Sequence, residues 1–268
     1  MFIQTETFSF NVLYEGNPNA PLVILSHALM ANLHLWDSTV LALHVAGYST
    51  IRYDHVGHGS TSRPTENQIG KLHFDDFCLD IERIISAVAP ERTPFAIIGC
   101  SMGGVLAIRY AMLHPGRVKK VVSCGAPGIN SLEESKPKWA ERIDLFTREG
   151  VAPLAELTVE RWIPGPFPEG VRDEALKQTL ECTLEGYRAC ADAIVNYKYR
   201  DELGKLQTED VMILVGEKDS AIGPKELSVE LASEIRGGRF MELKDCGHVP
   251  PLHRRKEFEK VIVDFFGS

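Results

Sequence analysis

Three residues that could together activate a nucleophile lie far apart in this chain: Ser101, Asp219 and His248. A serine hydroxyl is a weak nucleophile at neutral pH, so it needs a base, and the imidazole of His248 could accept its proton. A carboxylate such as that of Asp219 would fix the histidine tautomer and stabilise the imidazolium that forms. These residue types therefore predict acyl transfer through a covalent serine intermediate.

The sequence around Ser101 has the spacing G-x-S-x-G, formed by Gly99 and Gly103 on either side of the serine. This spacing is typical of a nucleophile elbow, a sharp turn from a strand into a helix. A small-residue turn is the alternative, but an apolar run at 95–98 precedes the motif and a helical pattern follows at 105–112. The two glycines would allow the close approach of strand and helix. The serine would then lie at a helix N-terminus, where the dipole favours developing negative charge.

Asp219 and His248 each follow a predicted strand. In open α/β sheets, catalytic groups gather beyond the carboxyl ends of the strands, which is where both residues would lie. Taken singly, Asp219 could be a turn residue and His248 a packed loop histidine. Glu217 and Asp245 are rival acids, but Glu217 lies earlier on its strand and Asp245 is too near His248 in sequence to orient it easily. We therefore expect Asp219 to be the partner of His248.

A loop at residues 27–32 follows the apolar run 21–26 and could supply a donor to an oxyanion. An acyl-transfer site on such a sheet takes one donor from a loop of this kind and one from the residue after the nucleophile. We expect the backbone N–H groups of Leu29 and Met102 to fill these roles. The alternative is a plain strand–helix turn, and His27 is expected to brace the loop rather than to act in catalysis.

Alternating strand and helix patterns predict the α/β class, with a mostly parallel sheet covered by helices on both faces. Residues 2–14 are expected to form an antiparallel, hairpin-like start. Further strands are predicted at 21–26, 48–53, 95–98, 118–123, 211–215 and 239–243. Helices are predicted at 33–46, 74–88, 105–112, 224–235 and 258–265.

Residues 131–205 differ in character from the rest of the chain. Charged residues at helical spacing dominate, no buried strand is apparent, and a Pro/Gly-rich break lies at 162–168. We predict a helical cap over residues 131–205, inserted into a core domain of residues 1–130 and 206–268. Such an insertion would exclude water from the site and shape the pocket.

Composition excludes several classes of protein. The 268 residues are 44% hydrophobic and 25% charged, which is ordinary for a globular α/β domain. The net charge of −8 gives no basic footprint for nucleic acid. No apolar stretch reaches the ~18 residues of a membrane span, and the N-terminal residues lack a signal-peptide pattern. We therefore expect a cytoplasmic protein without a nucleic-acid or membrane partner.

Cysteines and histidines give no sign of a metal or an organic cofactor, and we expect neither. Asp54, His55 and His58 lie in a Gly-rich turn, but a tight turn with hydrogen-bonding side chains is favoured because no supporting ligand cluster stands out elsewhere. The six cysteines form no C-x-x-C pair, which favours buried free thiols in a reducing compartment. Cys100, beside the predicted nucleophile, is expected to be structural. The six are Cys78, Cys100, Cys124, Cys182, Cys190 and Cys246.

The chain resembles the α/β-hydrolases along its whole length, including the order Ser101, Asp219, His248. Within that superfamily it resembles the 3-oxoadipate enol-lactonases. The similar segments are 99–104 (G-C-S-M-G-G), 27–37 (H-A-L-M-A-N-L-H-L-W-D), 53–60 (Y-D-H-V-G-H-G-S), 160–167 (E-R-W-I-P-G-P-F) and 184–194 (L-E-G-Y-R-A-C-A-D-A-I). The resemblance implies the same triad and oxyanion donors, and it places Trp162 near the substrate. In one departure, His27-Ala28 stands where enol-lactonases usually carry Asn-Ser.

These observations predict a serine hydrolase that cleaves an ester or lactone of a small molecule through an acyl-enzyme. The resemblance makes enol-lactonase-like activity the specific form of this prediction. Two alternatives use the same three residues: hydrolysis of a C–C bond in a diketone-like compound and cofactor-free perhydrolysis. A third alternative is a ligand receptor that keeps the fold without catalysis. The residues leave the oligomeric state and the identity of the substrate open.

Overall fold

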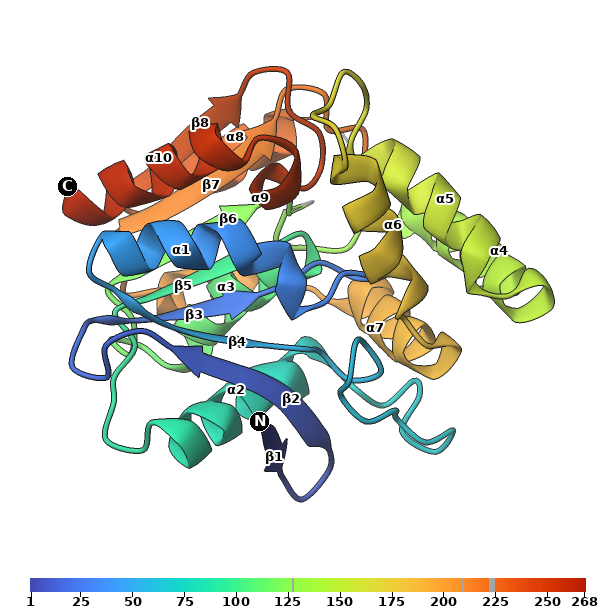
Figure 1. The fold of residues 1–268 in the computed structure, drawn as a ribbon, viewed down its shortest axis with the longest axis horizontal. Coiled ribbons are helices and arrows are strands. Elements are labelled where there is room, and N and C mark those ends of the chain that lie inside the picture. The colour runs from blue at the N-terminus through green and yellow to red at the C-terminus, as the bar shows by residue number, and fades with distance from the viewer. Residues whose placement is uncertain (127, 209, 222–224) are drawn as a thin grey trace.

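The fold is an eight-stranded, mostly parallel sheet with helices on both faces (Figure 1). The structure, a computed structural model, describes residues 1–126, 128–208, 210–221 and 225–268. Its strands are β1 (Phe2–Gln4), β2 (Ser9–Glu15), β3 (Leu22–Ser26), β4 (Ser49–Tyr53), β5 (Ala96–Cys100), β6 (Lys120–Cys124), β7 (Asp210–Gly216) and β8 (Gly238–Leu243). The strand order is β1-β2-β4-β3-β5-β6-β7-β8. The predicted fold class is therefore confirmed.

The pairing of the strands follows the predicted pattern. β1 and β2 pair antiparallel, β2 pairs antiparallel with β4, and the remaining neighbours are parallel. β3, β5 and β6 are buried at every position, as expected for strands covered on both faces. β8 lies at the edge of the sheet and alternates between half-buried and exposed positions until its last residue, Leu243, which is buried.

The helices outside the segment between β6 and β7 cover the two faces of the sheet (Figure 1). They are η1 (Leu33–Trp36), α1 (Asp37–Val45), α2 (Phe74–Val88), α3 (Met102–Leu113), α8 (Glu226–Glu234), α9 (Pro250–His253) and α10 (Arg255–Gly267), with η marking a 3₁₀ helix. The predicted helix 33–46 thus begins with a 3₁₀ turn before it becomes α-helical. The predicted start of the helix 224–235, at Pro224, lies outside the described residues.

Helices without strands fill the segment between β6 and β7, as far as its residues are described. They are η2 (Glu133–Ser135), α4 (Lys136–Glu149), α5 (Val151–Trp162), α6 (Val171–Leu180), α7 (Leu184–Asn196) and η3 (Arg200–Lys205). In Figure 1, α4 to α7 lie beyond one end of the sheet, to the right. The helical insertion is therefore present, while the domain boundaries at 131 and 205 stay a prediction.

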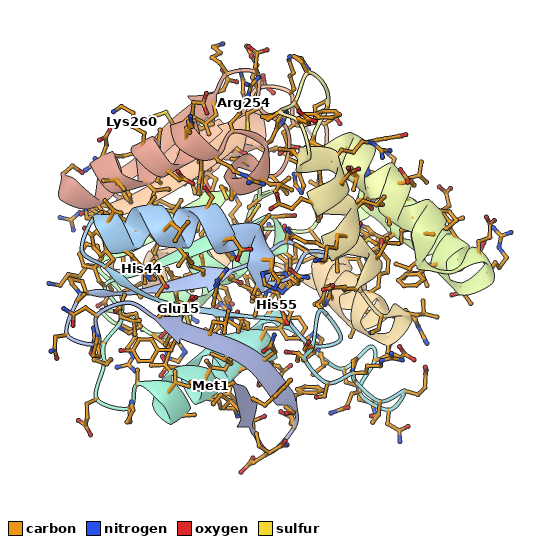
Figure 2. All side chains as sticks on the ribbon, in the orientation of Figure 1. Met1, Glu15, His44, His55, Arg254 and Lys260 are labelled. Atoms are coloured by element: carbon orange, nitrogen blue, oxygen red, sulfur yellow. The ribbon has the colours of Figure 1, made fainter. Side chains whose placement is uncertain are left out.

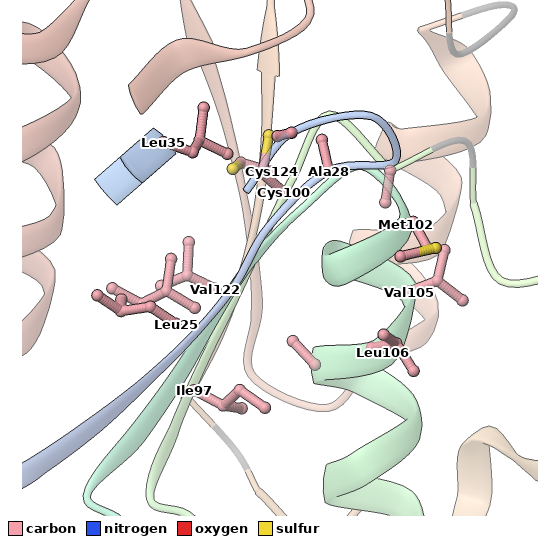
Figure 3. Close-up of a cluster of buried hydrophobic side chains, with 14 of the residues drawn as sticks. Leu25, Ala28, Leu35, Ile97, Cys100, Met102, Val105, Leu106, Val122 and Cys124 are labelled. Carbon is pink, nitrogen blue, oxygen red and sulfur yellow. The ribbon is translucent and has the colours of Figure 1, made fainter. Parts of the chain in front are cut away.

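Apolar side chains join the sheet to its helices. Figure 3 shows Leu25 and Val122 on one side of the strands and Ile97 on the side of α3. All three are fully buried, and Leu106 of α3 is buried with them in one hydrophobic cluster. The six cysteines are buried and free, as predicted. Among the described residues, no helix has the length and apolar character needed to cross a membrane.

The turn from β5 into α3 brings two backbones into close contact. Ser101 lies at this turn with φ 56° and ψ −115°, a conformation that L-residues rarely adopt. A Cβ at Gly99 would lie 1.8 Å from the carbonyl oxygen of Gly103. A Cβ at Gly103 would lie 2.1 Å from the carbonyl oxygen of Ser26. The two glycines of the G-x-S-x-G motif are therefore required by space, as the motif predicts.

Replacing Gly99 by alanine should destabilise the protein because backbone, rather than a flexible side chain, occupies the space the methyl group would need. We expect the free energy of unfolding to fall by at least about 2 kcal/mol, at the upper part of the range for overpacking. Urea denaturation measures this change. Gly204→Ala is the matched control, since nothing lies within 4 Å of its Cβ position. Equal urea midpoints of unfolding for Gly99→Ala and Gly204→Ala would contradict the close approach of the strand and helix backbones at Gly99.

Candidate active site

The fold brings together the three residues that the sequence singles out. His248 Nε2 lies 2.9 Å from Ser101 Oγ, and His248 Nδ1 lies 2.9 Å from Asp219 Oδ2. The Asp219 side chain is fully buried, and its other oxygen accepts a hydrogen bond of 2.9 Å from the N–H of Ala221. His248 is 6% exposed. The geometry permits a proton to pass from hydroxyl to imidazole while the carboxylate holds the ring.

The two rival acids are occupied elsewhere. Glu217 accepts hydrogen bonds from the N–H of Asp245 and from Lys244. Asp245 pairs with Lys218 at 2.6 Å. Both carboxylates take part in exposed ion pairs. The backbone N–H of Asp245 and then Lys244 lower the pKa of the Glu217 carboxyl, and Lys218 lowers the pKa of the Asp245 carboxyl. Of the three acids considered from the sequence, Asp219 is the one in contact with His248.

Leu29 and Met102 line the same cavity as Ser101. The backbone N–H of neither residue donates a hydrogen bond to any residue that the structure describes. Met102 is the first residue of α3, where N–H groups have no acceptor within the helix. The role of these two N–H groups as oxyanion donors stays a prediction.

The cavity above Ser101 lies between the strand ends and the helical insertion. Its lining is largely apolar and aromatic with a few polar groups, as is usual for a small-molecule site. Trp162, at the end of α5, lines it and is 3% exposed, and the carbonyl of Trp162 accepts the N–H of His248 at 2.9 Å. Two charged residues that line the cavity, Arg142 and Arg161, are not expected from the sequence. Helical spacing predicts helices in this segment, but spacing alone does not tell which helix face meets the cavity.

Three buried histidines form a cluster behind the loop that carries Leu29. The ring centroids of His27 and His55 are 4.3 Å apart, and those of His27 and His58 are 5.5 Å apart. His58 Nε2 accepts the N–H of Met30 at 3.1 Å, and His27 Nε2 accepts the N–H of His55 at 2.9 Å. Figure 2 shows His55 between the sheet and the helical insertion. The cluster therefore braces the loop, as expected for His27.

Each ring in this cluster is neutral because burial penalises the charged form. Burial lowers the pKa of His27 to about 4. Burial and then the neighbouring His27 lower the pKa of His58 to about 3. Their Nδ1 atoms lie 2.8 and 3.0 Å from the carbonyl oxygens of Ala28 and Val56, which assigns the proton to Nδ1. The ring nitrogens are thus committed to backbone groups.

The turn at residues 54–60 is held by its own side chains. Asp54 accepts hydrogen bonds from the N–H groups of Leu33 and Ser60, at 2.8 and 3.0 Å. The interpretation as a tight turn with hydrogen-bonding side chains is confirmed. In the described part of the chain, no group of three or more His, Cys, Asp or Glu residues is arranged to hold a metal.

Acid should destabilise this protein through His27. In the unfolded chain a histidine has a pKa near 6.5 and binds a proton that the folded protein excludes down to about pH 4. The contribution of neutral His27 to the free energy of unfolding is therefore fully present above pH 6.5 and decreases as the pH falls. At pH 4 the loss from His27 alone is about 3 kcal/mol. Urea denaturation between pH 7 and pH 4.5 measures the slope.

The variant His27→Gln should flatten that slope by up to about 1.4 kcal/mol per pH unit, the value for one proton. The control His34→Gln replaces an exposed histidine, with its side chain 57% exposed, and should keep the wild-type slope. An unchanged slope in His27→Gln would mean that His27 is not the group that resists protonation.

Known proteins resemble this chain in sequence along most of its length. The sequence profile of the alpha/beta hydrolase fold matches residues 21–163, more than half of the chain. The chain is 26% identical over 220 residues to 3-oxoadipate enol-lactonase 2 of Acinetobacter baylyi, covering 81% of this chain and 78% of that protein. It is 25% identical to a monoacylglycerol lipase of Xenopus laevis, covering 97% of this chain and 80% of the lipase.

Solved structures give the same result. The enol-lactonase from Burkholderia xenovorans LB400 superposes with a TM-score of 0.87 at 25% identity, and the match covers 100% of both chains. An esterase from Exiguobacterium antarcticum superposes with a TM-score of 0.87 at 22% identity, over 100% of this chain and 99% of the esterase, and it shows the shared fold. Enol-lactonases and esterases thus occur among the relatives and structural neighbours of this enzyme. The chain belongs to the alpha/beta hydrolase fold family.

Proposed function

We propose that this enzyme is a serine hydrolase that cleaves an ester or lactone bond of a small molecule through an acyl-enzyme. The observation that carries the proposal is the chain of two 2.9 Å contacts from Ser101 through His248 to Asp219. In this proposal Ser101 is the nucleophile, His248 is the base and Asp219 orients the imidazole.

The first half of the reaction forms the acyl-enzyme. Ser101 Oγ attacks the carbonyl carbon while its proton moves to His248 Nε2. The negative charge that develops on the carbonyl oxygen is stabilised by the N–H groups of Leu29 and Met102. When the bond between the carbonyl carbon and the leaving oxygen breaks, the imidazolium returns its proton to that oxygen. In a lactone the leaving oxygen remains part of the same molecule.

The second half of the reaction uses water. A water molecule gives a proton to His248 Nε2 as it attacks the acyl carbon, and the same two N–H groups stabilise the second oxyanion. The bond to Ser101 Oγ then breaks, and the imidazolium reprotonates the serine. The carboxylic acid leaves and the enzyme returns to its starting state, with protons and electrons balanced by one water.

A lactone is the more specific substrate that we propose, in line with the names of two proteins similar to this chain. One is a 3-oxoadipate enol-lactonase and the other an enol-lactonase of known structure. In this chain Trp162 would contact the substrate from the insertion side, since it lines the cavity with Ser101. His27-Ala28, where enol-lactonases usually carry Asn-Ser, lies directly before Leu29.

We also propose residues 131–205 as a cap that closes the site over a core of residues 1–130 and 206–268. In support, cavity residues come from α4, α5 and α7 of this segment and from the ends of core strands. The contact of cap and core includes a backbone approach, because a Cβ at Gly57 would lie 2.4 Å from the Cα of Gly186. The cap would exclude bulk water from the site when the substrate is bound.

A substrate panel separates the lactone proposal from the two alternatives on the same residues. Lactones, aryl esters and β-diketones are incubated with the enzyme, with and without hydrogen peroxide, and the products are identified. Hydroxy or oxo acids from lactones support the proposal. Cleavage of diketones alone, or peracid formation that outpaces hydrolysis, would replace it.

Removing the nucleophile tests the mechanism directly. Ser101→Ala should lower kcat by at least about 10³-fold, because the remaining donors and binding contacts give only residual catalysis. Steady-state kinetics on the best ester or lactone of the panel measures the loss. Ser131→Ala is a matched control, since this hydroxyl lies outside the cavity. Near-normal turnover by Ser101→Ala would end the proposal.

A fluorophosphonate probe distinguishes an enzyme from a ligand receptor that keeps the fold. The probe reacts with a serine hydroxyl that an adjacent histidine activates. We expect labelling of wild-type protein at Ser101 and none in Ser101→Ala. A wild-type protein that stays unlabelled would favour the receptor.

A further inference from the structure

Two arginines of the helical insertion line the cavity that contains Ser101. Arg142 comes from α4 and Arg161 from α5, and both are half-buried. The rest of the lining that faces them is largely apolar and aromatic, and includes Trp139, Trp162 and Tyr187. Two guanidinium groups in such a lining are costly to keep unless something balances their charge.

The polar contacts of the two side chains are with neutral groups. Arg161 donates hydrogen bonds to the carbonyl of Leu157 at 3.2 Å and to the hydroxyl of Thr158 at 3.3 Å. Arg142 stacks over Trp139, with 4.9 Å between the guanidinium carbon and the ring centroid. No ion pair found within the described residues includes either arginine.

The charge on Arg161 is destabilised in this setting. Burial, and then the like charge of Arg142, lower the pKa of the Arg161 guanidinium to about 10, so it still carries its charge near neutral pH. The carboxylate of Asp219 raises the pKa of Arg161, but this carboxylate is already hydrogen-bonded to His248. Other insertion arginines have partners of their own: Arg172 pairs with Glu156, and Arg188 pairs with Glu66.

We propose that Arg142 and Arg161 form an anion-binding subsite and that the substrate is an ester or lactone that carries a carboxylate. A guanidinium fork fits a carboxylate with two parallel hydrogen bonds, and a substrate carboxylate would offset the repulsion between the two positive charges. The inference rests on the proposed hydrolase function and adds the charge of the substrate. It also means that the cap supplies the specificity, while the core supplies the reacting groups.

A pair of chromogenic esters tests the subsite. Mono-4-nitrophenyl glutarate carries a carboxylate at neutral pH, and its methyl ester is a neutral molecule of nearly the same shape. We expect wild-type enzyme to prefer the anion in kcat/KM, and Arg161→Gln and Arg142→Gln each to reduce the anion-to-neutral ratio by about 10- to 100-fold, as for a charge-assisted hydrogen bond. Arg161→Lys should retain part of the preference, because it keeps the charge but loses the fork.

Arg188→Gln is the matched control. It removes one positive charge from the same insertion, and its partner Glu66 lies outside the cavity. It should leave the ratio at the wild-type value, which separates a local contact from the net charge of the cap. A wild-type preference for the neutral ester, or a ratio that neither arginine substitution changes, would overturn the proposal.

A second measurement distinguishes a failure of the anion subsite from a failure of the proposed hydrolase function. Glutarate, as a free dicarboxylate, should slow the labelling of Ser101 by a neutral fluorophosphonate in the wild type and not in Arg161→Gln. Labelling that glutarate leaves unaffected in both proteins overturns the anion subsite while the serine hydrolase stands. A wild-type protein that the probe does not label overturns the hydrolase function and, with it, the substrate assignment.

Discussion

The strained backbone at Ser101 is the constraint on which the site depends. A serine with φ 56° persists only where the surrounding structure holds it. Here the Ser101 N–H donates to the carbonyl of Cys124 at 2.7 Å, and the carbonyl of Ser101 accepts the N–H of Gly104 at 2.9 Å. The close approaches at Gly99 and Gly103 fix the strand and the helix on either side. The hydroxyl is therefore presented at one place relative to His248, and the rest of the fold is arranged around it.

A second polar structure supports the loop opposite the elbow. Met30 also has a positive φ, 68°, and its N–H is held by His58. The same His58 nitrogen lies 3.4 Å from the thiol of Cys182, just before α7, so one ring contacts both the loop and the insertion. The histidine cluster thus connects the position of Leu29 to the docking of the helices above it. A buried network of this kind is stabilising only while every member has its partner.

The helical insertion and the sheet share one apolar core. Buried apolar residues of the insertion, such as Phe146, Val159 and Tyr187, belong to the same hydrophobic cluster as the strands. Polar contacts join the two parts as well: the Thr183 hydroxyl donates to the carbonyl of Gly57 at 2.8 Å, and Asn32 donates to Glu181 at 2.6 Å. Apolar burial and specific hydrogen bonds therefore act together to hold the insertion against the rest of the chain.

The sequence by itself determined the elements that local pattern controls. Local pattern predicted the buried strands β3, β5 and β7, the amphipathic helix α2 and the turn between the two glycines around Ser101. It also placed Ser101, Asp219 and His248, in that order, at the ends of strands. The sequence also favoured Asp219 over Glu217 and Asp245, and the tertiary structure fixes the contact of Asp219 with His248 at 2.9 Å, a distance that depends on how two loops fold over each other. Only the tertiary structure decided that Arg142 and Arg161 line the cavity that contains Ser101. The sequence of a mixed-charge helix such as α4 does not show which face turns toward a cavity, because that face is set by how the neighbouring helices α5 and α7 pack against it.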